Sequence, residues 1–399
     1  MQADDVSMTP LRQPSTLWLR SLLGAAMALP MLVFYAIGAL GPYLVADLGV
    51  SENRLGYLTM SAFALAAFVS VWAGAIVDRL GGRRALGLLF GICALAYALA
   101  GLLPGFEGLV IALAICGAAQ ALANPATNLL IAENLPVAER AATVGVKQAG
   151  VQVSALLAGL LLPVIAQGLG WRAALVVFAP IALMLGWISM RHLPVLPQGR
   201  SCLTLALHRP STGLALLMAV QCCVAIALSS FVTYLGVYAR TLGVPSVLAG
   251  TLVAVFGVMG ILARVWLTPL AARMKDESVM LGVLCLLAAL AVFSLGHASP
   301  YFWGWLWVGS IGMGLTAVAT NAVAMSMALR DRSFGAPAAS ASLLSVGFFG
   351  GFALGPPLLG WLLRRSQGYS EIGWAMIAVL LLGGFLCVWL GAWRRAGRS

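Results

Sequence analysis

The chain has 399 residues, of which 62% are hydrophobic and only 9% are charged, and its mean hydropathy is +1.00. Soluble domains contain about 45–50% apolar residues, so this composition excludes an ordinary soluble protein. The net charge is +11, and the seven cysteines lie mostly within apolar stretches without metal-ligand spacing. Neither a disulfide framework nor a metal site is therefore predicted.

Twelve apolar blocks follow one another along the chain, and each of roughly 20–28 residues is long enough to cross a bilayer as a helix. We therefore expect an all-α polytopic membrane protein with twelve transmembrane helices. The first block is too long for a signal-peptide core and is expected to remain as a span. The blocks are 21–46, 55–77, 85–103, 107–132, 141–168, 171–193, 211–238, 246–272, 278–297, 301–328, 336–364 and 370–392.

The basic residues are distributed unevenly between the two sides of the membrane. If the amino terminus is cytoplasmic, seventeen Lys and Arg residues fall on the inner side and only five on the outer side, namely Arg54, Arg172, Arg240, Arg364 and Arg365. This bias follows the positive-inside rule. It predicts a multi-pass protein of the cytoplasmic (inner) membrane with both termini in the cytoplasm, and it explains the basic charge without nucleic acid as a partner.

The sequence divides into two related halves. The longest internal loop, 194–210, separates an amino-terminal six-helix bundle (1–193) from a carboxy-terminal six-helix bundle (211–399). Two such pseudo-symmetric bundles around a midplane site are a recurrent transporter plan. Three residue pairs repeat at a constant offset of 197: Gly117 and Gly314, Asn124 and Asn321, and Gly150 and Gly347.

One face of the eleventh block carries Gly347, Gly351 and Gly355 at i, i+4 and i+8. Small residues in this pattern let two helix backbones approach closely within a membrane. We therefore expect this face to pack against a neighbouring helix.

A short charged turn lies between the second and third blocks. It contains Gly74, Asp78, Arg79, Gly81, Arg83 and Arg84. These residues resemble the signature of the major facilitator superfamily, which is Gly, any three residues, Asp, Arg, any residue, Gly and a basic cluster. The chain length, the twelve spans and the central loop resemble this family as well, so the resemblance implies its fold.

In that family the charged turn acts as a latch between the two halves in the outward-facing state, so these six residues are expected to form a conformational latch. The alternative is that a basic hairpin only fixes the topology. The corresponding stretch of the second half, 268–273, keeps Arg273 but lacks the Asp. The latch is therefore expected to depend on Asp78.

Three further stretches resemble bacterial members of the cyanate and nitroimidazole permease type. They are Ala123-Asn124-Pro125, the run 146–150, and Gly170-Trp171-Arg172. This narrower likeness is less specific and does not name a substrate.

Arg264 is the clearest charged residue inside a span. It precedes Arg273 by nine residues, which places it about 13 Å deeper along a helix that rises ~1.5 Å per residue. Buried ionisable residues in membranes usually face a cavity or a partner. No acidic residue lies near the middle of any span, so we expect the partner to be an anionic substrate. The alternative is an Arg held by backbone carbonyls and polar side chains.

Other polar residues interrupt the apolar helices and are predicted to help bind the substrate. These are Tyr35, Gln120, Asn124, Asn128, Gln148, Gln152, Tyr234 and Asn321. Amide side chains also join helices to one another, which is the alternative role for each of them. Lys147 is expected to extend to the surface at the start of the fifth span, and the alternative is a role in substrate binding.

The sequence therefore predicts a secondary active transporter that moves a small organic, anionic solute by alternating access, with the lipid bilayer around it. Anion–proton symport, exchange and simple facilitation remain open. No cofactor is expected, the protein is expected to be a monomer, and no enzyme is predicted because no nucleophile–base or paired-carboxylate constellation is present. The alternative function is a multidrug or metabolite efflux pump of the same fold.

Overall fold

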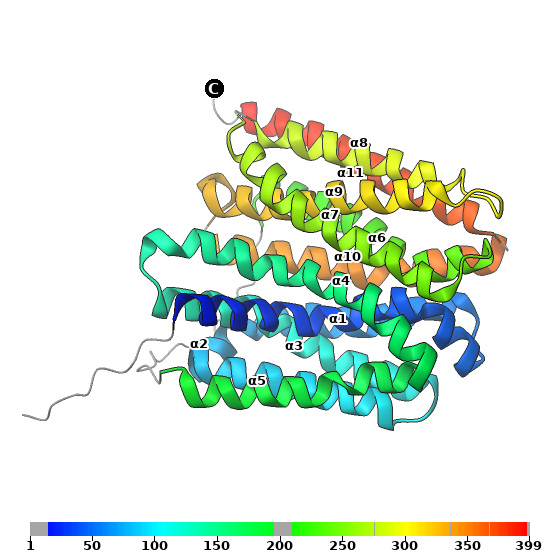
Figure 1. The fold of residues 1–399 in the computed structure, drawn as a ribbon. Coiled ribbons are helices and arrows are strands. Elements are labelled where there is room, and N and C mark those ends of the chain that lie inside the picture. The colour runs from blue at the N-terminus through cyan, green and yellow to red at the C-terminus, as the bar shows by residue number, and fades with distance from the viewer. Residues whose placement is uncertain (1–14, 195–209, 275, 336, 367, 397–399) are drawn as a thin grey trace, which may run out of the picture.

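The computed structural model describes residues 15–194, 210–274, 276–335, 337–366 and 368–396. Helices make up nearly all of this part of the chain and lie side by side as one bundle (Figure 1). The described chain starts and finishes at the same end of the bundle, which we call the terminal end; the opposite end is the far end. The elements are α1 (Thr16–Leu48), η1 (Glu52–Arg54), α2 (Leu55–Leu102), α3 (Gly105–Asn134), α4 (Val137–Val176), α5 (Phe178–His192), α6 (Thr212–Thr241), α7 (Ser246–Ala272), α8 (Glu277–Leu295), α9 (Gly304–Arg330), η2 (Arg332–Phe334), α10 (Pro337–Ser366) and α11 (Tyr369–Ala396).

Ten helical stretches in the described residues are long and apolar enough to cross a membrane. Two of them, Glu52–Leu102 and Val137–His192, are 51 and 56 residues long, about twice what one crossing needs. Each is interrupted by a glycine with a positive φ, 75° at Gly81 and 82° at Gly170, a conformation that side chains disfavour. Each stretch therefore makes two crossings, and the predicted total of twelve is confirmed.

The same helix crossing occurs in both halves of the molecule. A Cβ atom at Gly117 of α3 would clash with the Ala62 carbonyl oxygen of α2, and one at Gly314 of α9 would lie 2.6 Å from the Phe256 carbonyl oxygen of α7. Gly117 and Gly314 repeat at the offset of 197, and Ala62 and Phe256 are 194 residues apart. Two pseudo-symmetric six-helix bundles are thus confirmed. The limits of 1–193 and 211–399 stay a prediction, because most of the loop 194–210 lies outside the described residues.

The glycine face of the eleventh span packs as predicted. Cβ atoms at Gly351 and Gly355 of α10 would each lie 2.6 Å from a backbone oxygen of α6, those of Cys222 and Ile226. Gly347 faces the Met218 oxygen one turn earlier. The two backbones therefore touch along two helical turns inside the carboxy-terminal half.

The two halves meet along a seam formed by α1, α2 and α4 on one side and α6, α7 and α10 on the other. In its far part, the hydroxyls of Thr59 and Thr233 lie 2.9 Å apart. The Tyr369 hydroxyl donates a hydrogen bond to the Glu52 carboxylate, and the Tyr234 hydroxyl lies 3.4 Å from the Asn53 carbonyl oxygen. These contacts close the far end of the seam.

Four phenylalanine rings fill the seam between these polar contacts and the middle of the bundle. Phe34 and Phe63 come from the amino-terminal half, and Phe349 and Phe352 come from the carboxy-terminal half. Ring centroids across the seam are 4.5 Å apart for Phe63 and Phe352 and 5.1 Å apart for Phe34 and Phe352. These distances are typical of favourable aromatic pairs, so the rings form an apolar barrier.

An acidic residue missed by the sequence analysis anchors the far end of α1. Both the Trp171 indole and the Arg172 guanidinium donate to the same oxygen of Asp47, each at 2.8 Å. The Arg172 guanidinium also stacks over the Trp171 ring at 4.3 Å. The run Gly170-Trp171-Arg172 thus joins the turn after the fifth crossing to the end of the first.

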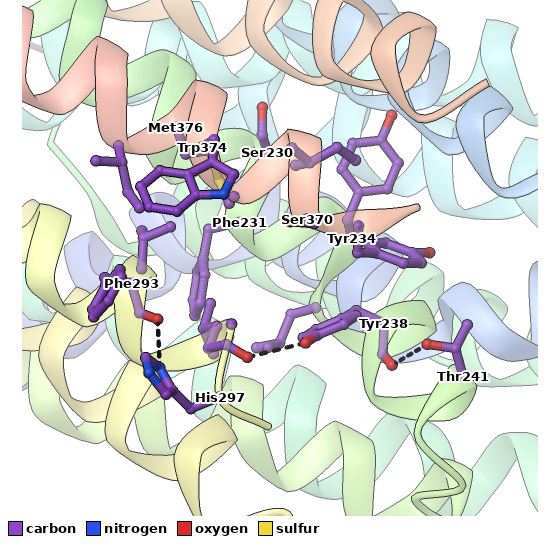
Figure 2. Close-up of a pocket in the computed structure, with 18 residues that line it drawn as sticks. Ser230, Phe231, Tyr234, Tyr238, Thr241, Phe293, His297, Ser370, Trp374 and Met376 are labelled. Atoms are coloured by element: carbon purple, nitrogen blue, oxygen red, sulfur yellow. Dashed lines mark hydrogen bonds between the residues drawn. The ribbon is translucent and has the colours of Figure 1, made fainter. Parts of the chain in front are cut away.

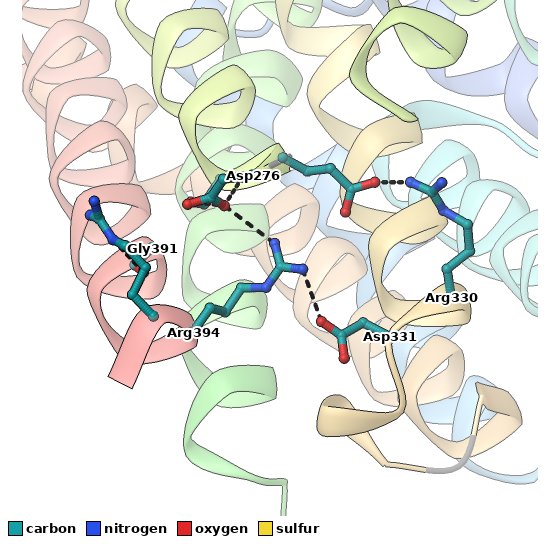
Figure 3. A network of polar contacts seen from close by, with 8 residues as sticks. Asp276, Arg330, Asp331, Gly391 and Arg394 are labelled. Carbon is teal, nitrogen blue, oxygen red and sulfur yellow. Dashed lines mark hydrogen bonds and ion pairs between the residues drawn. The ribbon is translucent and has the colours of Figure 1, made fainter. Parts of the chain in front are cut away.

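An ionic network ties three helices together at the terminal end of the carboxy-terminal half (Figure 3). Arg394 of α11 pairs with Asp276, which precedes α8, at 3.3 Å and with Asp331, which follows α9, at 2.9 Å. Beside it, Arg330 pairs with Glu277. Because Arg394 is buried, both aspartates hold its charge in place.

Asp331 titrates differently from an isolated aspartate. Burial opposes its ionisation, but hydrogen bonds from Ser333, whose backbone N–H lies 3.0 Å away, and from Arg394 outweigh burial. The pKa of the Asp331 carboxyl is therefore held below its ordinary value, and the ionised form is the one the fold prefers.

Candidate functional site

Arg264 lies on α7 where that helix faces α4 across the seam. Its NH1 donates to the Gln148 side-chain oxygen at 3.5 Å. Its Nε is enclosed without a hydrogen-bond partner, and in the described part of the chain no Asp or Glu forms an ion pair with it. A guanidinium that keeps unused donors inside a membrane protein is suited to receive an oxyanion.

Lys147 does not extend to the surface, so the expectation of a surface lysine was wrong. It is fully buried, and its Nζ donates to Asn128 Oδ1 at 2.6 Å, to Thr127 Oγ1 at 2.8 Å and to Asn124 Oδ1 at 3.4 Å. These acceptors lie at i, i+3 and i+4 on one face of α3. All three N–H donors of the ammonium group are therefore hydrogen-bonded within the protein, so the side chain does not need to extend to water.

The two cations belong to one cluster. Gln148 Nε2 donates to Asn124 Oδ1 at 3.0 Å, while the same amide accepts from Arg264. The polar contacts therefore continue from α3 through α4 to α7 and cross from one half to the other. We call Asn124, Asn128, Lys147, Gln148 and Arg264 the seam cluster.

Three more predicted residues lie beside the seam cluster. Tyr35 is buried on α1 close to Arg264 and Gln152. Gln152 packs against α7 so tightly that a Cβ at Gly260 would lie 2.6 Å from its Oε1. The Oε1 atoms of Gln152 and of Gln120, one turn before Asn124, are enclosed without a hydrogen-bond partner. Enclosed polar atoms without partners are costly in a native fold, so they indicate a place where a ligand or water binds.

The remaining two predicted residues are not joined to the seam cluster. The Tyr234 hydroxyl donates to the Pro356 carbonyl oxygen at 2.7 Å, at the far end. Gly314 of α9 contacts Phe256 of the parallel helix α7. Asn321 follows Gly314 by seven residues and Arg264 follows Phe256 by eight, so Asn321 and Arg264 lie at similar depths. No hydrogen bond links Asn321 to Arg264 among the described residues.

The predicted latch residues lie at the terminal end, around the turn at Gly81 inside α2. The side chains of Asp78, Arg79 and Arg84 are exposed there, and Arg83 is half-buried. Gly74 lies one turn before Asp78 on the same helix. Their role as a latch stays a prediction.

A separate cavity of about 570 Å³ lies within the carboxy-terminal half, between α6, α8 and α11 at the far end. Its wall combines aliphatic and aromatic side chains, and Phe231, Tyr238, Phe293 and Trp374 are arranged around it (Figure 2). Tyr234 is the only predicted substrate-binding residue in its lining. Because the whole lining belongs to one half, rocking of the halves would not expose this cavity to the two sides in turn.

The chemistry of the seam cluster is that of an anion site. It contains two cationic side chains, amide donors and acceptors, and no carboxylate. Neutral oxygens satisfy the hydrogen bonds of Lys147 but do not cancel its charge, and charges inside a membrane are usually paired. The cluster has no nucleophile–base pair, and the described residues hold no group of three or more metal-ligating side chains.

Sequence comparisons place the chain among membrane transporters. A sequence model of the Major Facilitator Superfamily matches residues 22–336. The "Probable anion transporter 3, chloroplastic" of Arabidopsis thaliana is 31% identical over 148 residues, 37% of this chain and 28% of that protein. The "Probable sulfoacetate transporter SauU" of Cupriavidus necator is 28% identical over 156 residues, 38% of this chain and 35% of that protein. Each match thus spans about a third or less of the relative's length.

The structure is similar to that of a bacterial homologue of the human lysosomal transporter Spinster, crystallised in an inward-facing and occupied conformation. The TM-score is 0.72 and the sequence identity is 18%, with 98% of each chain covered. At this identity the likeness shows the fold.

Proposed function

Because the chain belongs to the major facilitator superfamily, whose fold is that of transporters, we propose that it moves a small organic anion across the cytoplasmic membrane by alternating access. The observation that carries the proposal is the Arg264–Gln148 contact, which joins the two halves at a half-buried cation. Among the described residues this cation has no carboxylate partner. An anion bound there would contact both halves, so its binding would depend on how the two halves are placed.

The relatives support this substrate class. One is named an anion transporter and the other a sulfoacetate transporter, and sulfoacetate carries a sulfonate and a carboxylate. A planar guanidinium binds either group through two parallel hydrogen bonds. The narrower likeness to cyanate and nitroimidazole permeases stays a prediction.

The closed far end indicates which state the structure represents. With the basic terminal end in the cytoplasm, the contacts of Glu52 with Tyr369 and of Thr59 with Thr233 lie on the outer side. The protein would then be in an inward-facing state, in which the seam cluster communicates with the cytoplasm. The latch around Asp78 would act in the opposite, outward-facing state.

Import of an anion by a monomer, without catalysis or cofactor, is the simplest form of this proposal. The aromatic cavity beside Tyr234 is the feature that favours the alternative of a multidrug or metabolite efflux pump. All lining residues of that cavity come from one half, whereas the seam cluster contains residues of both halves. Alternating access therefore favours the seam cluster as the transport site.

A ligand-stabilisation screen tests the proposal. The purified full-length protein is heated with monocarboxylates, dicarboxylates, sulfonates, inorganic anions and lipophilic cations, alongside the variants Arg264→Ala and Arg264→Lys. We expect organic anions to raise the melting temperature of wild type, Arg264→Ala to lose this effect, and Arg264→Lys to keep part of it. Arg240→Ala, at an exposed far-end position, is the matched control and should respond as wild type does.

Two results would contradict the proposal. If organic anions stabilise Arg264→Ala as well as they stabilise wild type, Arg264 is not the anion anchor. If only lipophilic cations stabilise wild type, the protein is an efflux pump.

A further inference from the structure

We propose that the cavity of about 570 Å³ between α6, α8 and α11 holds one acyl chain of a phospholipid from the surrounding leaflet, and that the bound chain keeps the far end of the seam closed. The lipid is a regulator that stays in its leaflet and is not the transported solute. This inference goes beyond the proposed anion transport and does not depend on it, because none of the cavity's described lining residues belongs to the seam cluster.

The wall of the cavity continues into the surface that the bilayer covers. Phe293 of α8 and Trp374 of α11 line the cavity, yet these residues are 45% and 57% exposed. Their ring centroids lie 6.0 Å apart. Closer to the middle of the bundle, the same two helices carry the exposed apolar side chains of Leu290 and Leu381. A lipid chain can therefore pass from this lipid-facing surface into the cavity without meeting water.

The interior of the cavity favours hydrocarbon over water. The hydroxyls of Tyr238 and Tyr234 donate to backbone carbonyl oxygens at 3.0 Å and 2.7 Å (Figure 2 shows the first), and the Tyr369 hydroxyl donates to Glu52. Because these hydroxyls are already hydrogen-bonded, the tyrosines offer a guest mainly their rings. Apolar cavities stay dry and take up apolar guests, and the volume lies within the range of about 300–1,000 Å³ that is common for ligand pockets.

Polar side chains mark the edge of the cavity at the ends of its helices. Thr241 is the last residue of α6, His297 follows the end of α8 by two residues, and Ser370 is the second residue of α11. All three are exposed. These helix ends lie at the far end of the bundle, where a bilayer has its headgroups. The cavity therefore has the same order as a phospholipid, with polar groups at the membrane surface and hydrocarbon below them.

Two residues of the cavity wall also close the far end of the seam. Tyr369 donates to Glu52, and the Tyr234 hydroxyl lies 3.4 Å from the Asn53 carbonyl oxygen, so both reach the amino-terminal half. The Tyr369 ring packs against the Tyr238 ring, which also lines the cavity, with centroids 4.9 Å apart. An empty cavity leaves the Tyr369 ring room to turn away from Glu52. An acyl chain fills that room and holds the ring where its hydroxyl reaches Glu52.

Binding of the chain and closure of the far end must therefore favour each other. If the lipid binds the closed state more tightly than the open state, it shifts the population toward the closed state. Closure then increases the affinity for the lipid by the same factor. Because all lining residues belong to one half, movement of the halves does not carry the chain across the membrane.

A phosphatidylcholine with a diazirine in its acyl chain tests the site in proteoliposomes of the full-length protein. Irradiation attaches the chain to the residues that it contacts, and mass spectrometry of peptides locates them. We expect label on Phe231 and Ile372, which line the cavity but are buried, so that lipid outside the cavity does not reach them. Gly373→Leu should lose this label. Gly373 lines the cavity and a Cβ there meets no atom within 4 Å, so the new side chain fills the space without a clash.

Two further variants show that the loss of label reports the filled cavity. Gly91→Leu is the matched control, because Gly91 of α2 has equally open space around its Cβ and lies in the other half. It should keep the label on Phe231. Val292→Phe enlarges a side chain in the α8 wall and should lose the label as Gly373→Leu does. Gel filtration and melting temperature establish that each variant is folded.

The effect on the far end is measured with spin labels at Ala46 and Arg365, exposed positions near the far ends of α1 and α10, in a background without native cysteines. The protein is purified in digitonin, a detergent with a rigid steroid body instead of a chain. Added lysophosphatidylcholine should shift the distances of wild type and Gly91→Leu toward the closed state and leave those of Gly373→Leu unchanged. Glu52→Ala lies outside the cavity lining and should lower the yield of photolabel, because it weakens the closed state.

Three results would overturn the proposal. The first is photolabel confined to exposed residues such as Phe293 and Trp374, or label on Phe231 that both filling variants keep. The second is a distance distribution that does not respond to lysophosphatidylcholine in wild type, or responds equally in Gly373→Leu. The third is a lipophilic cation that displaces the photoreactive lipid and is itself transported, since the cavity would then be the drug site of an efflux pump.

Discussion

The contact between Tyr369 and Glu52 gives the sharpest test of the closed far end. It joins α11 to η1 across the seam, so it can exist only while the far end is closed. Tyr369→Phe removes the hydroxyl and leaves the ring, which packs against the Tyr238 ring with centroids 4.9 Å apart. The substitution should therefore weaken the closed state without disturbing the packing within the carboxy-terminal half.

The size of the effect follows from the type of bond. A hydrogen bond to a charged group contributes about 1.5–3 kcal/mol. Both residues are half-buried, so the lower value of about 1.5 kcal/mol applies, and about 1.4 kcal/mol corresponds to a tenfold change in an equilibrium constant. We expect the ratio of far-end-closed to far-end-open molecules to fall about tenfold.

Distance measurement between spin labels at Ala46 and Arg240, exposed positions near the far ends of α1 and α6, reports this ratio in a background without native cysteines. Tyr238→Phe is the matched control, because its hydroxyl bonds to Leu295 within the same half at 3.0 Å. It should leave the distance distribution unchanged. An unchanged distribution in Tyr369→Phe, or an equal shift in both variants, would refute the assignment of this contact as a gate.

Three further predictions concern the scaffold and the latch. Arg394→Gln should lower the free energy of unfolding by about 1–3 kcal/mol, measured by thermal melting. Because the pKa of Asp331 is lowered in the fold, the difference from wild type should be complete at neutral pH. It should shrink as the pH falls below about 4, where Asp331 of the unfolded chain takes up a proton first, and vanish below the lowered pKa of the folded protein. Gly351→Leu should destabilise the protein by about 1–3 kcal/mol, since even a Cβ would overlap a backbone oxygen of α6. The neighbouring Gly350→Leu is the control, because a Cβ there meets open space, and it should not destabilise the protein. Equal melting temperatures of the two variants would contradict the close packing. Asp78→Asn should slow anion uptake into proteoliposomes while the stabilisation by anion is kept; unchanged uptake would leave the turn with a topological role only.

Features encoded in short stretches of sequence could be predicted. The twelve crossings follow from hydropathy, because a bilayer requires about 20 apolar residues per helix whatever the neighbours are. The repeat of Gly117 at Gly314 was visible as an offset and corresponds to a helix crossing. The structure brings Arg264 within hydrogen-bond distance of Gln148, and both residues were predicted to bind the substrate.

Features that depend on pairing between distant segments could not be predicted. Glu52 and Tyr369 are separated by 317 positions, and each lies at a helix end where a polar residue needs no partner. The burial of Lys147 was missed because a lysine near the start of a span usually reaches water. The signal that could have revealed it lies on another helix, where Asn124, Thr127 and Asn128 form a polar face at i, i+3 and i+4.

The four phenylalanines in the seam have an electrical consequence. Phe34, Phe63, Phe349 and Phe352 offer no side-chain donor or acceptor, and their rings pack against one another across the seam beyond Tyr35 in tilted and edge-to-face arrangements. A file of water molecules cannot bridge such a segment without losing hydrogen bonds at every step. Protons and small ions therefore cannot leak past the site while the far end is closed, so the membrane potential is protected during the time that the site is open to one side.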